Sequence, residues 1–370
     1  CSSDLPTPRP PVTLIRPICG LENNLERCLA SSFQLDWPTY EILFCVARAD
    51  DPAASLARRL MAEHPDIPST LLVGEDPFSA NPKLNNVVKG WHSARHDWIV
   101  MTDSNVLMPS DSIERMIARW DAQTGLVCSP PAGTEPENAG AVLESAWLDS
   151  FQARWQLFAD ACGFGFAQGK SMLFNRHVMT QLGGFERLGD EVAEDAAATL
   201  LIRSAGLKVR IVHEPFPQPL GPRDIKAVWK RQLRWARLRR ASFPLYFLPE
   251  ILTGAALPMA AMIALAATGT LPLIASIAYL ATWYGAEVLL ARSYGWPSGW
   301  RIVPAMLARD LLLPGLFVAA WFGSGFEWRG NAMTVADNDN SRTARFRTAV
   351  ARTRDRAREK ARALVAARSH

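Results

Sequence analysis

The chain has 370 residues, more than one compact domain usually needs, and its 49% hydrophobic content and mean hydropathy of zero exclude a disordered or collagen-like protein. The net charge of +4 is unevenly spread: residues 341–370 hold nine Arg and one Lys against two acids, a net of +8, which leaves −4 for the rest. An acidic body with a basic tail argues against a nucleic-acid binder.

The cysteines and the first residues suggest little chemistry. The six cysteines show no CxxC spacing, so we expect small buried thiols in a reducing compartment. Four prolines lie in residues 1–11, which we expect to form a linker after a missing N-terminal anchor. Arg outnumbers Lys 33 to 7, a composition that favours a bacterial source.

Residues 12–225 are expected to form one α/β domain. Buried apolar runs alternate with segments of helical spacing, which predicts a mostly parallel sheet covered by helices. Ligands bind beyond the carboxyl ends of the strands in such sheets, so the polar residues that follow strands are the candidates for function. The expected strands are Val12–Ile15, Tyr40–Val46, Ser69–Val73, Asp97–Thr102 and Gly125–Cys128, and the expected helices are Leu21–Ser31, Pro52–His64 and Asp111–Asp121.

Two kinds of segment follow this domain. Residues 226–243 are basic and amphipathic, as in a helix on a membrane surface. Ile251–Ala286 then has no charged residue, which is long enough for a helical hairpin, and we expect membrane spans at about 247–267 and 271–291.

A third hydrophobic segment, 302–326, allows two interpretations. Arg309 and Asp310 interrupt it, and a charge at the bilayer centre costs at least about 2.5–3.5 kcal/mol. The segment either spans the membrane with this pair facing protein or water, or lies on the surface as a re-entrant or interfacial helix. Because basic residues flank the hairpin on one side, that side is expected to be cytoplasmic, and the third segment decides on which side the tail at 331–370 lies.

Four polar clusters stand at positions where this fold binds ligands. They are Asp50-Asp51 after the second strand, Asp103-Ser104-Asn105 after the strand ending at Thr102, Glu194-Asp195 at the start of a helical run, and Arg231-Gln232-Leu233-Arg234-Trp235 in the basic stretch. Taken singly, each acid is as easily explained as a helix cap or a first-turn acid. The occurrence of all four clusters in this order is a more specific signal than any one of them alone.

Together with the runs Leu35–Ile42, Cys45–Ala53, Asn81–Asn86 and Ala193–Arg210, these clusters resemble the ceramide glucosyltransferase family, inverting glycosyltransferases of the GT-A fold. The resemblance covers most of the chain except the tail. It implies a mixed, mostly parallel sheet domain followed by C-terminal transmembrane helices.

The resemblance implies a binding site for a UDP-sugar. Asp51 resembles the acid that contacts uridine, with Asp50 beside it, and Lys83 is a candidate for the donor phosphates. Asp103 resembles the first acid of a DxD element that holds Mg²⁺ or Mn²⁺, ions that prefer oxygen ligands. Asn105 stands in the place of the second Asp, which weakens the expected metal site. Arg231, Arg234 and Trp235 resemble the RxxRW element at the diphosphate.

The resemblance also assigns the chemistry of transfer. Asp195 resembles the general base that removes the acceptor hydroxyl's proton, with Glu194 as its orienting neighbour. Gln152, Gly169 and Ser171 fall in the expected acceptor region, and Gln152 stands where the animal relatives carry His.

The expected function is therefore transfer of glucose or another hexose from a UDP-sugar to a lipid hydroxyl, by a multi-pass membrane protein with its catalytic domain on the cytoplasmic side of a bacterial inner membrane. Ceramide, diacylglycerol and a hopanoid-like lipid remain open as acceptors. A processive polysaccharide synthase and a non-catalytic sugar-nucleotide binder remain as alternatives.

Overall fold

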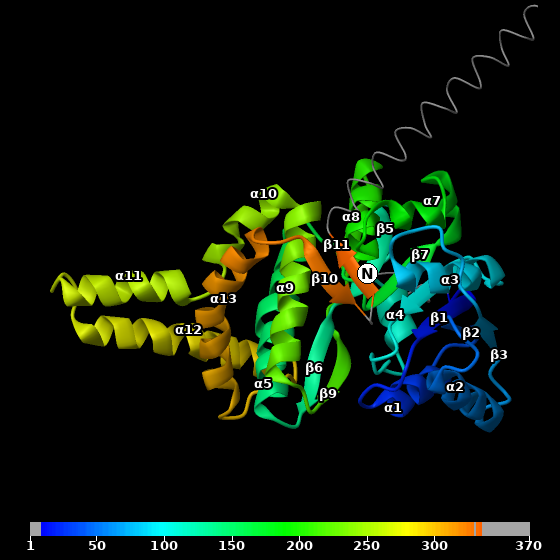
Figure 1. Ribbon diagram of the computed structural model, residues 1–370, viewed down its shortest axis with the longest axis horizontal. Coiled ribbons are helices and arrows are strands. Elements are labelled where there is room, and N and C mark those ends of the chain that lie inside the picture. The colour runs from blue at the N-terminus through cyan, green and yellow to red at the C-terminus, as the bar shows by residue number, and fades with distance from the viewer. Residues whose placement is uncertain (1–8, 329–330, 335–370) are drawn as a thin grey trace, which may run out of the picture.

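A seven-stranded sheet lies at the centre of the computed structural model, which describes residues 9–328 and 331–334 (Figure 1). The strand order is β3-β2-β1-β4-β7-β5-β8. All neighbours pair in parallel except β7, which runs antiparallel between β4 and β5. The strands are β1 (Val12–Ile18), β2 (Tyr40–Val46), β3 (Ser69–Val73), β4 (Trp98–Thr102), β5 (Thr124–Ser129), β7 (Ser171–Asn175) and β8 (Lys208–Ile211).

Helices cover both faces of the sheet because successive strand residues point to opposite sides. Leu14 and Phe44 belong to one hydrophobic cluster, and their neighbours Ile15 and Cys45 belong to the other. The covering helices are α1 (Leu25–Ala30), α2 (Pro52–Glu63), α3 (Pro82–Ser93), α4 (Ser112–Ile117), α6 (Arg154–Ala161), α7 (Arg176–Gln181) and α8 (Glu194–Ser204), with 3₁₀ turns at Ser31–Phe33 and Phe185–Asp190.

Helix caps fix where the polar residues lie. Asn81 accepts hydrogen bonds from the backbone N–H groups of Lys83 and Leu84, and Pro82 supplies a fixed φ at the first position of α3. Asp51 caps α2 in the same way, accepting from Ala53 N. Each cap therefore places a candidate residue at the carboxyl edge of the sheet.

A second layer lies beside the sheet and carries the basic helix α9 (Ile225–Ser242). Helix α5 (Ala139–Trp147) continues through a π-helical turn (η2, Leu148–Ala153) into α6, and α9 packs against α5. A two-stranded parallel ribbon, β6 (Pro131–Pro136) with β9 (Phe216–Gly221), connects this layer to the sheet.

The apolar C-terminal region has three helical segments long and apolar enough to cross a membrane, Pro244–Ala267, Leu273–Ser293 and Ile302–Trp321. In Figure 1, α11 and α12 project from the body as a hairpin, and α13 runs across its base alongside α5 and α9. The elements are α10 (Pro244–Phe247), η4 (Leu248–Leu252), α11 (Ala256–Ala267), α12 (Leu273–Ser293), α13 (Ile302–Trp321), β10 (Gly325–Trp328) and β11 (Asn331–Thr334).

The five strands expected from the sequence all occur, with shifts at their ends. The first strand, β1, continues through Pro17 to Ile18. Proline has no N–H to donate, but β4 pairs with β1 only as far as Ile15, so no hydrogen bond to β4 is lost at Pro17. The helix expected at Leu21–Ser31 begins only at Leu25, since Asn24 has a left-handed backbone (φ 58).

The helical segments after the domain also differ from expectation. The segment expected at 247–267 is broken by a 3₁₀ turn, so α11 begins only at Ala256, and the segment expected at 302–326 ends at Trp321, before Gly323 with φ 84. Cys19 and Cys162 are exposed, contrary to the expectation of buried thiols, while Cys28, Cys45 and Cys128 are buried. Residues 1–8 of the expected linker and most of the expected basic tail lie outside the described residues.

Candidate active site

The centre of the site is the ammonium group of Lys83, which lies between two carboxylates. Its Nζ is 2.6 Å from Asp103 Oδ1 and 2.7 Å from Glu194 Oε1, and it donates a 2.7 Å hydrogen bond to the carbonyl of Gly169. Three separate elements meet here: Lys83 is in the first turn of α3, Asp103 follows β4, and Glu194 begins α8. Burial alone would lower the pKa of Lys83, but the two carboxylates raise it above its ordinary value, so Lys83 is charged.

Asp195 lies beside this centre and is partly exposed. Its carboxylate accepts hydrogen bonds from Gly169 N (3.0 Å) and Ala196 N (2.8 Å). Burial, together with the negative charge of Glu194, raises the pKa of Asp195 to about 6. A carboxylate with this pKa is ionised at neutral pH and is a stronger proton acceptor than an ordinary Asp.

Gly169 brings the loop before β7 into close contact with both acids. A Cβ at this position would lie 2.6 Å from Glu194 Oε1, so only glycine fits without displacing the acid. Ser171 begins β7 and is fully buried. Gly169, unlike Ser171, therefore lies directly against Glu194 and Asp195.

Lys170 and Asn105 extend the cluster. The Nζ of Lys170 is 3.2 Å from Asp103 Oδ2 and donates to Asn105 Oδ1 at 3.1 Å, while the Asn105 amide donates to Glu22 at 3.2 Å. Two side-chain oxygens therefore face one cation, and oxygen ligands of this kind suit Mg²⁺ or Mn²⁺. No group of three or more His, Cys, Asp or Glu side chains able to hold a metal occurs among the described residues.

Asp51 lies one loop away and ties two strand ends together. In addition to capping α2, it accepts from Gly20 N at 2.9 and 3.0 Å, so the loops after β1 and β2 are held side by side. Asp50 instead points to solvent, where it pairs with Arg48 at 2.6 Å. The structure thus separates these adjacent acids, and Asp50 makes no described contact with the other candidates.

The residues of α9 lie against α5. Arg231 forms an ion pair with Glu144, which is fully buried and also lies 3.5 Å from Arg223. Burial lowers the pKa of Arg231. Trp235 packs on a cluster formed by Ala141, Leu148 and Leu220, and Arg234 lies half-buried beside it. Gln152, in the π-helical turn, donates to Gln232 at 2.9 Å, which places it on this α9 side of the site.

Comparison with known proteins identifies the chain. The sequence profile of glycosyl transferase family 21 matches residues 2–341. The chain belongs to glycosyl transferase family 21. Its sheet, with one antiparallel strand between parallel neighbours, agrees with the GT-A fold expected for such a protein.

Two ceramide glucosyltransferases are similar in sequence to this chain. Ceramide glucosyltransferase 3 of Caenorhabditis elegans is 26% identical over 338 residues, covering 88% of this chain and 73% of the relative. Ceramide glucosyltransferase of Komagataella phaffii is 36% identical over 287 residues, covering 62% of this chain and 56% of the relative. Among solved structures, a mannosyltransferase from Pyrobaculum calidifontis in complex with GDP-Man and Mn²⁺ has a TM-score of 0.48 at 22% identity. The match covers 82% of this chain and 88% of the mannosyltransferase.

Three charged residues of the candidate site were not among the candidates chosen from the sequence. Glu22 follows a glycine loop after β1, Glu144 lies in an apolar helix, and Lys170 stands in a run that only superficially resembles a phosphate-binding loop. The negative charge of Glu22 acts on both Arg223 and Arg231, which links the α9 side electrostatically to Asn105 and the acid cluster. A signal for Glu144 was available: a buried acid in a helix requires a cation nearby.

Proposed function

We propose that this family 21 protein is an inverting glycosyltransferase that moves glucose from UDP-glucose to a hydroxyl of ceramide, at the cytoplasmic face of a bacterial inner membrane. The observation that carries the proposal is the carboxylate of Asp195, a partly exposed residue, directly beside the Lys83, Asp103 and Glu194 cluster. Family membership and the names of the curated relatives support the choice of donor and acceptor.

Asp195 is proposed to act as the general base. Its ionised carboxylate takes the proton of the acceptor hydroxyl as the hydroxyl oxygen bonds to C1 of glucose. The bond between C1 and the diphosphate oxygen breaks in the same step, its electron pair leaves with UDP, and one displacement inverts the configuration. A positioned base of this kind contributes about 10²–10⁴ in rate.

The leaving diphosphate needs positive charge, and the site offers several cations. Lys83 and Lys170 lie in the acid cluster, and α9 supplies Arg231 and Arg234. Asp103 and Asn105 would hold a Mg²⁺ or Mn²⁺ ion, which supplies further neutralising charge when bound. Asp51 is proposed to contact the uracil ring, and Trp235 to line the donor site.

The acceptor is proposed to approach from the side of Gly169, because its N–H and carbonyl contact Asp195 and Lys83. Gln152 and Ser171 are proposed as more distant parts of the acceptor region. Glu194 positions Lys83, since it holds both that side chain and Asn81.

The test is to incubate membranes containing the protein with labelled UDP-glucose and, separately, ceramide, diacylglycerol and a hopanoid alcohol. Labelled β-glucosylceramide is expected. Label on diacylglycerol or the hopanoid alone would change the proposed acceptor, and no labelled lipid with any acceptor would contradict the function.

A further inference from the structure

The α11–α12 hairpin is short compared with a bilayer. Helix α11 has 12 residues, which at about 1.5 Å each gives about 18 Å. From Tyr284 onward, one face of helix α12 packs on the body through Tyr284, Glu287 and Ala291, while Leu289 on its other face remains exposed, so that only Leu273–Trp283 extends outward from the body. The hydrocarbon core is about 30 Å thick, so the tip of the hairpin reaches only about halfway across it.

The tip is suited to a place inside the bilayer. The segment Ile251–Ala286 has no charged side chain. At the turn, the hydroxyls of Thr268 and Thr270 lie 2.9 Å apart, and Thr268 also donates to the carbonyl of Leu265 at 3.1 Å. The backbone N–H groups of Thr270 and Leu271 both donate to the same carbonyl. The hydroxyl and N–H groups of the turn therefore bond within the turn, as hydrocarbon favours.

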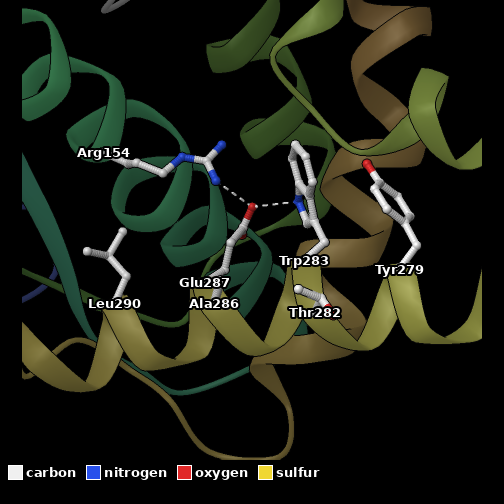
Figure 2. Close-up of a pocket in the computed structure, with 7 residues that line it drawn as sticks. All are labelled: Arg154, Tyr279, Thr282, Trp283, Ala286, Glu287 and Leu290. Atoms are coloured by element: carbon white, nitrogen blue, oxygen red, sulfur yellow. Dashed lines mark hydrogen bonds and ion pairs between the residues drawn. The ribbon is translucent and has the colours of Figure 1, made fainter.

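The base of the hairpin is joined to the body by buried charges. Glu287 of α12 pairs with Arg154 of α6 at 2.7 Å and with Arg309 of α13 at 3.0 Å. Figure 2 shows Arg154 and Trp283 both directed at Glu287, on the wall of an open cavity of about 500 Å³. Asp310 accepts from Tyr284 and pairs with Arg309. Arg309 and Asp310, the charged pair that interrupts the third hydrophobic segment, therefore face protein and have partners there.

Helix α13 is attached to the catalytic body along its length. Near its start, Ile302 shares a buried cluster with Val142 and Ala146 of α5. In the middle, Arg309 donates to Ala146 O and Ser150 Oγ. Near its end, Leu316 and Ala320 pack with Val228 and Ala236 of α9.

The chain after α13 also remains on this body. Arg240 of α9 lies over the ring of Trp321 at 5.4 Å, and Arg237 donates to the carbonyls of Phe322 and Gly325. If α13 crossed the membrane, α9 would have to enter the hydrocarbon beside it. Seven of the fifteen residues at 226–240 are Lys or Arg, and each would cost several kcal/mol there.

We propose that the region Pro244–Trp321 enters only one leaflet. The hairpin inserts from the side on which the catalytic sheet lies, and α10, η4 and α13 lie in the headgroup interface around its base. Their outward apolar side chains fit this position: Leu245 (79% exposed), Tyr246, Leu248, Leu252, Leu311 (59%), Val318 and Trp321. The chain thus returns to the side from which it came, and this holds whatever the donor and acceptor are.

Reporter cysteines in the full chain test the proposal, with Cys1, Cys19 and Cys162 replaced by Ser and the buried Cys28, Cys45 and Cys128 retained in every variant, including a parent without a reporter. Glu63→Cys on α2 reports the side of the catalytic sheet, Ser324→Cys reports the end of α13, and Thr270→Cys reports the hairpin tip; all three positions are exposed. The variants are labelled with a membrane-impermeant maleimide in sealed vesicles of each orientation, with and without detergent.

We expect Glu63→Cys and Ser324→Cys to react in the same vesicles, and Thr270→Cys to react only after detergent is added. A fluorophore at Thr270→Cys should be quenched most strongly by lipids brominated near the ends of the acyl chains. Reaction of Thr270→Cys in intact vesicles from either face, or reaction of Ser324→Cys from the face opposite Glu63→Cys, would overturn the proposal. So would recovery of the protein wholly in the soluble fraction.

Discussion

Two lysines share the negative charge of Asp103, and this decides how the site can bind phosphate or metal. Lys83 reaches one oxygen of Asp103 and Lys170 the other. Both carboxylate oxygens of Asp103, which is partly exposed, therefore have a cation partner in the absence of donor. The incoming diphosphate or metal therefore competes for partners that are already satisfied.

Asp195→Asn removes the proposed base without changing the size of the side chain. We expect kcat to fall by about 10²–10⁴, because an amide cannot accept the proton of the acceptor hydroxyl. The affinity for UDP, measured by calorimetry, should stay roughly unchanged. Asp66→Asn, at an exposed position on the surface loop before β3, is the matched control and should keep full activity.

The pKa of Asp195 predicts a pH dependence. Because burial raises this pKa to about 6, the carboxylate is ionised above that pH and progressively protonated below it. We expect kcat/KM to be level near pH 7.5 and to fall about tenfold for each pH unit well below 6. A profile still flat at pH 5 would contradict the assignment of Asp195 as the base.

Lys170→Met tests whether this lysine opposes metal binding at Asp103 and Asn105. Two unit charges 4 Å apart repel by about 1 kcal/mol even in water, about fivefold in affinity. We therefore expect Mn²⁺, titrated without nucleotide, to bind the variant at least several-fold more tightly than the parent. Lys208→Met, a lysine on β8, is the matched control and should leave Mn²⁺ binding unchanged, whereas weaker binding to the Lys170 variant would argue for a different metal position.

At the scale of elements, α5, α9 and α13 form one packed unit that joins the site to the membrane region. Glu144 of α5 holds Arg231 of α9, and Ala146 and Ser150 hold Arg309 of α13. The helix that carries Arg231 and Arg234 thus packs directly against α13.

Glu287→Gln should weaken the attachment of the hairpin to this unit. Loss of the carboxylate leaves Arg309, which is fully buried, with fewer compensating charges, and breaking a buried ion pair costs about 3–5 kcal/mol. We expect a clearly lower melting temperature in detergent. Arg292→Gln, exposed on the same helix, is the control and should melt like the parent. Equal melting temperatures for the two variants would show that the buried charges do not fix α12.

At the scale of the whole molecule, the candidate active site and the interfacial helices belong to one body, with the hairpin projecting from it (Figure 1). The proposed lipid acceptor would then meet the site at the level of the headgroups, where its hydroxyl is accessible, while its tails remain in the leaflet. If the acceptor is a lipid, as proposed, this arrangement accounts for a sheet domain and an apolar helical region in one body.

Leu311→Asp places a charge on the outward side of α13. If this surface lies in the interface, we expect reduced binding to vesicles and slower transfer to a bilayer acceptor, with transfer to a short-chain, water-soluble acceptor retained. Val73→Asp, an exposed apolar position on β3 far from the hairpin, is the matched control. Flotation with vesicles and rates with both acceptors provide the measurement, and loss of both activities would instead indicate damage to the fold.

The sequence by itself determined much of this protein. The five expected strands occur where apolar runs predict them, whereas β7 and β8 of the same sheet were not expected. Caps such as Asn81 and Asp51 are local features of a few residues. The acids that follow strands could be selected because parallel strands bring their carboxyl ends together. The order of the motifs then led to the family.

Only the tertiary structure decided the rest, because it depends on contacts between distant parts of the chain. Asp50 and Asp51 are adjacent in sequence, yet one faces solvent and the other joins two loops. Glu22, Glu144 and Lys170 stand in ordinary local contexts, and only folding brings their charges to the candidate site. In the sequence, Arg309 and Asp310 only interrupt a hydrophobic segment. In the fold, partners contributed by α5, the π-helical turn after it and α12 surround this pair, which holds α13 against the body.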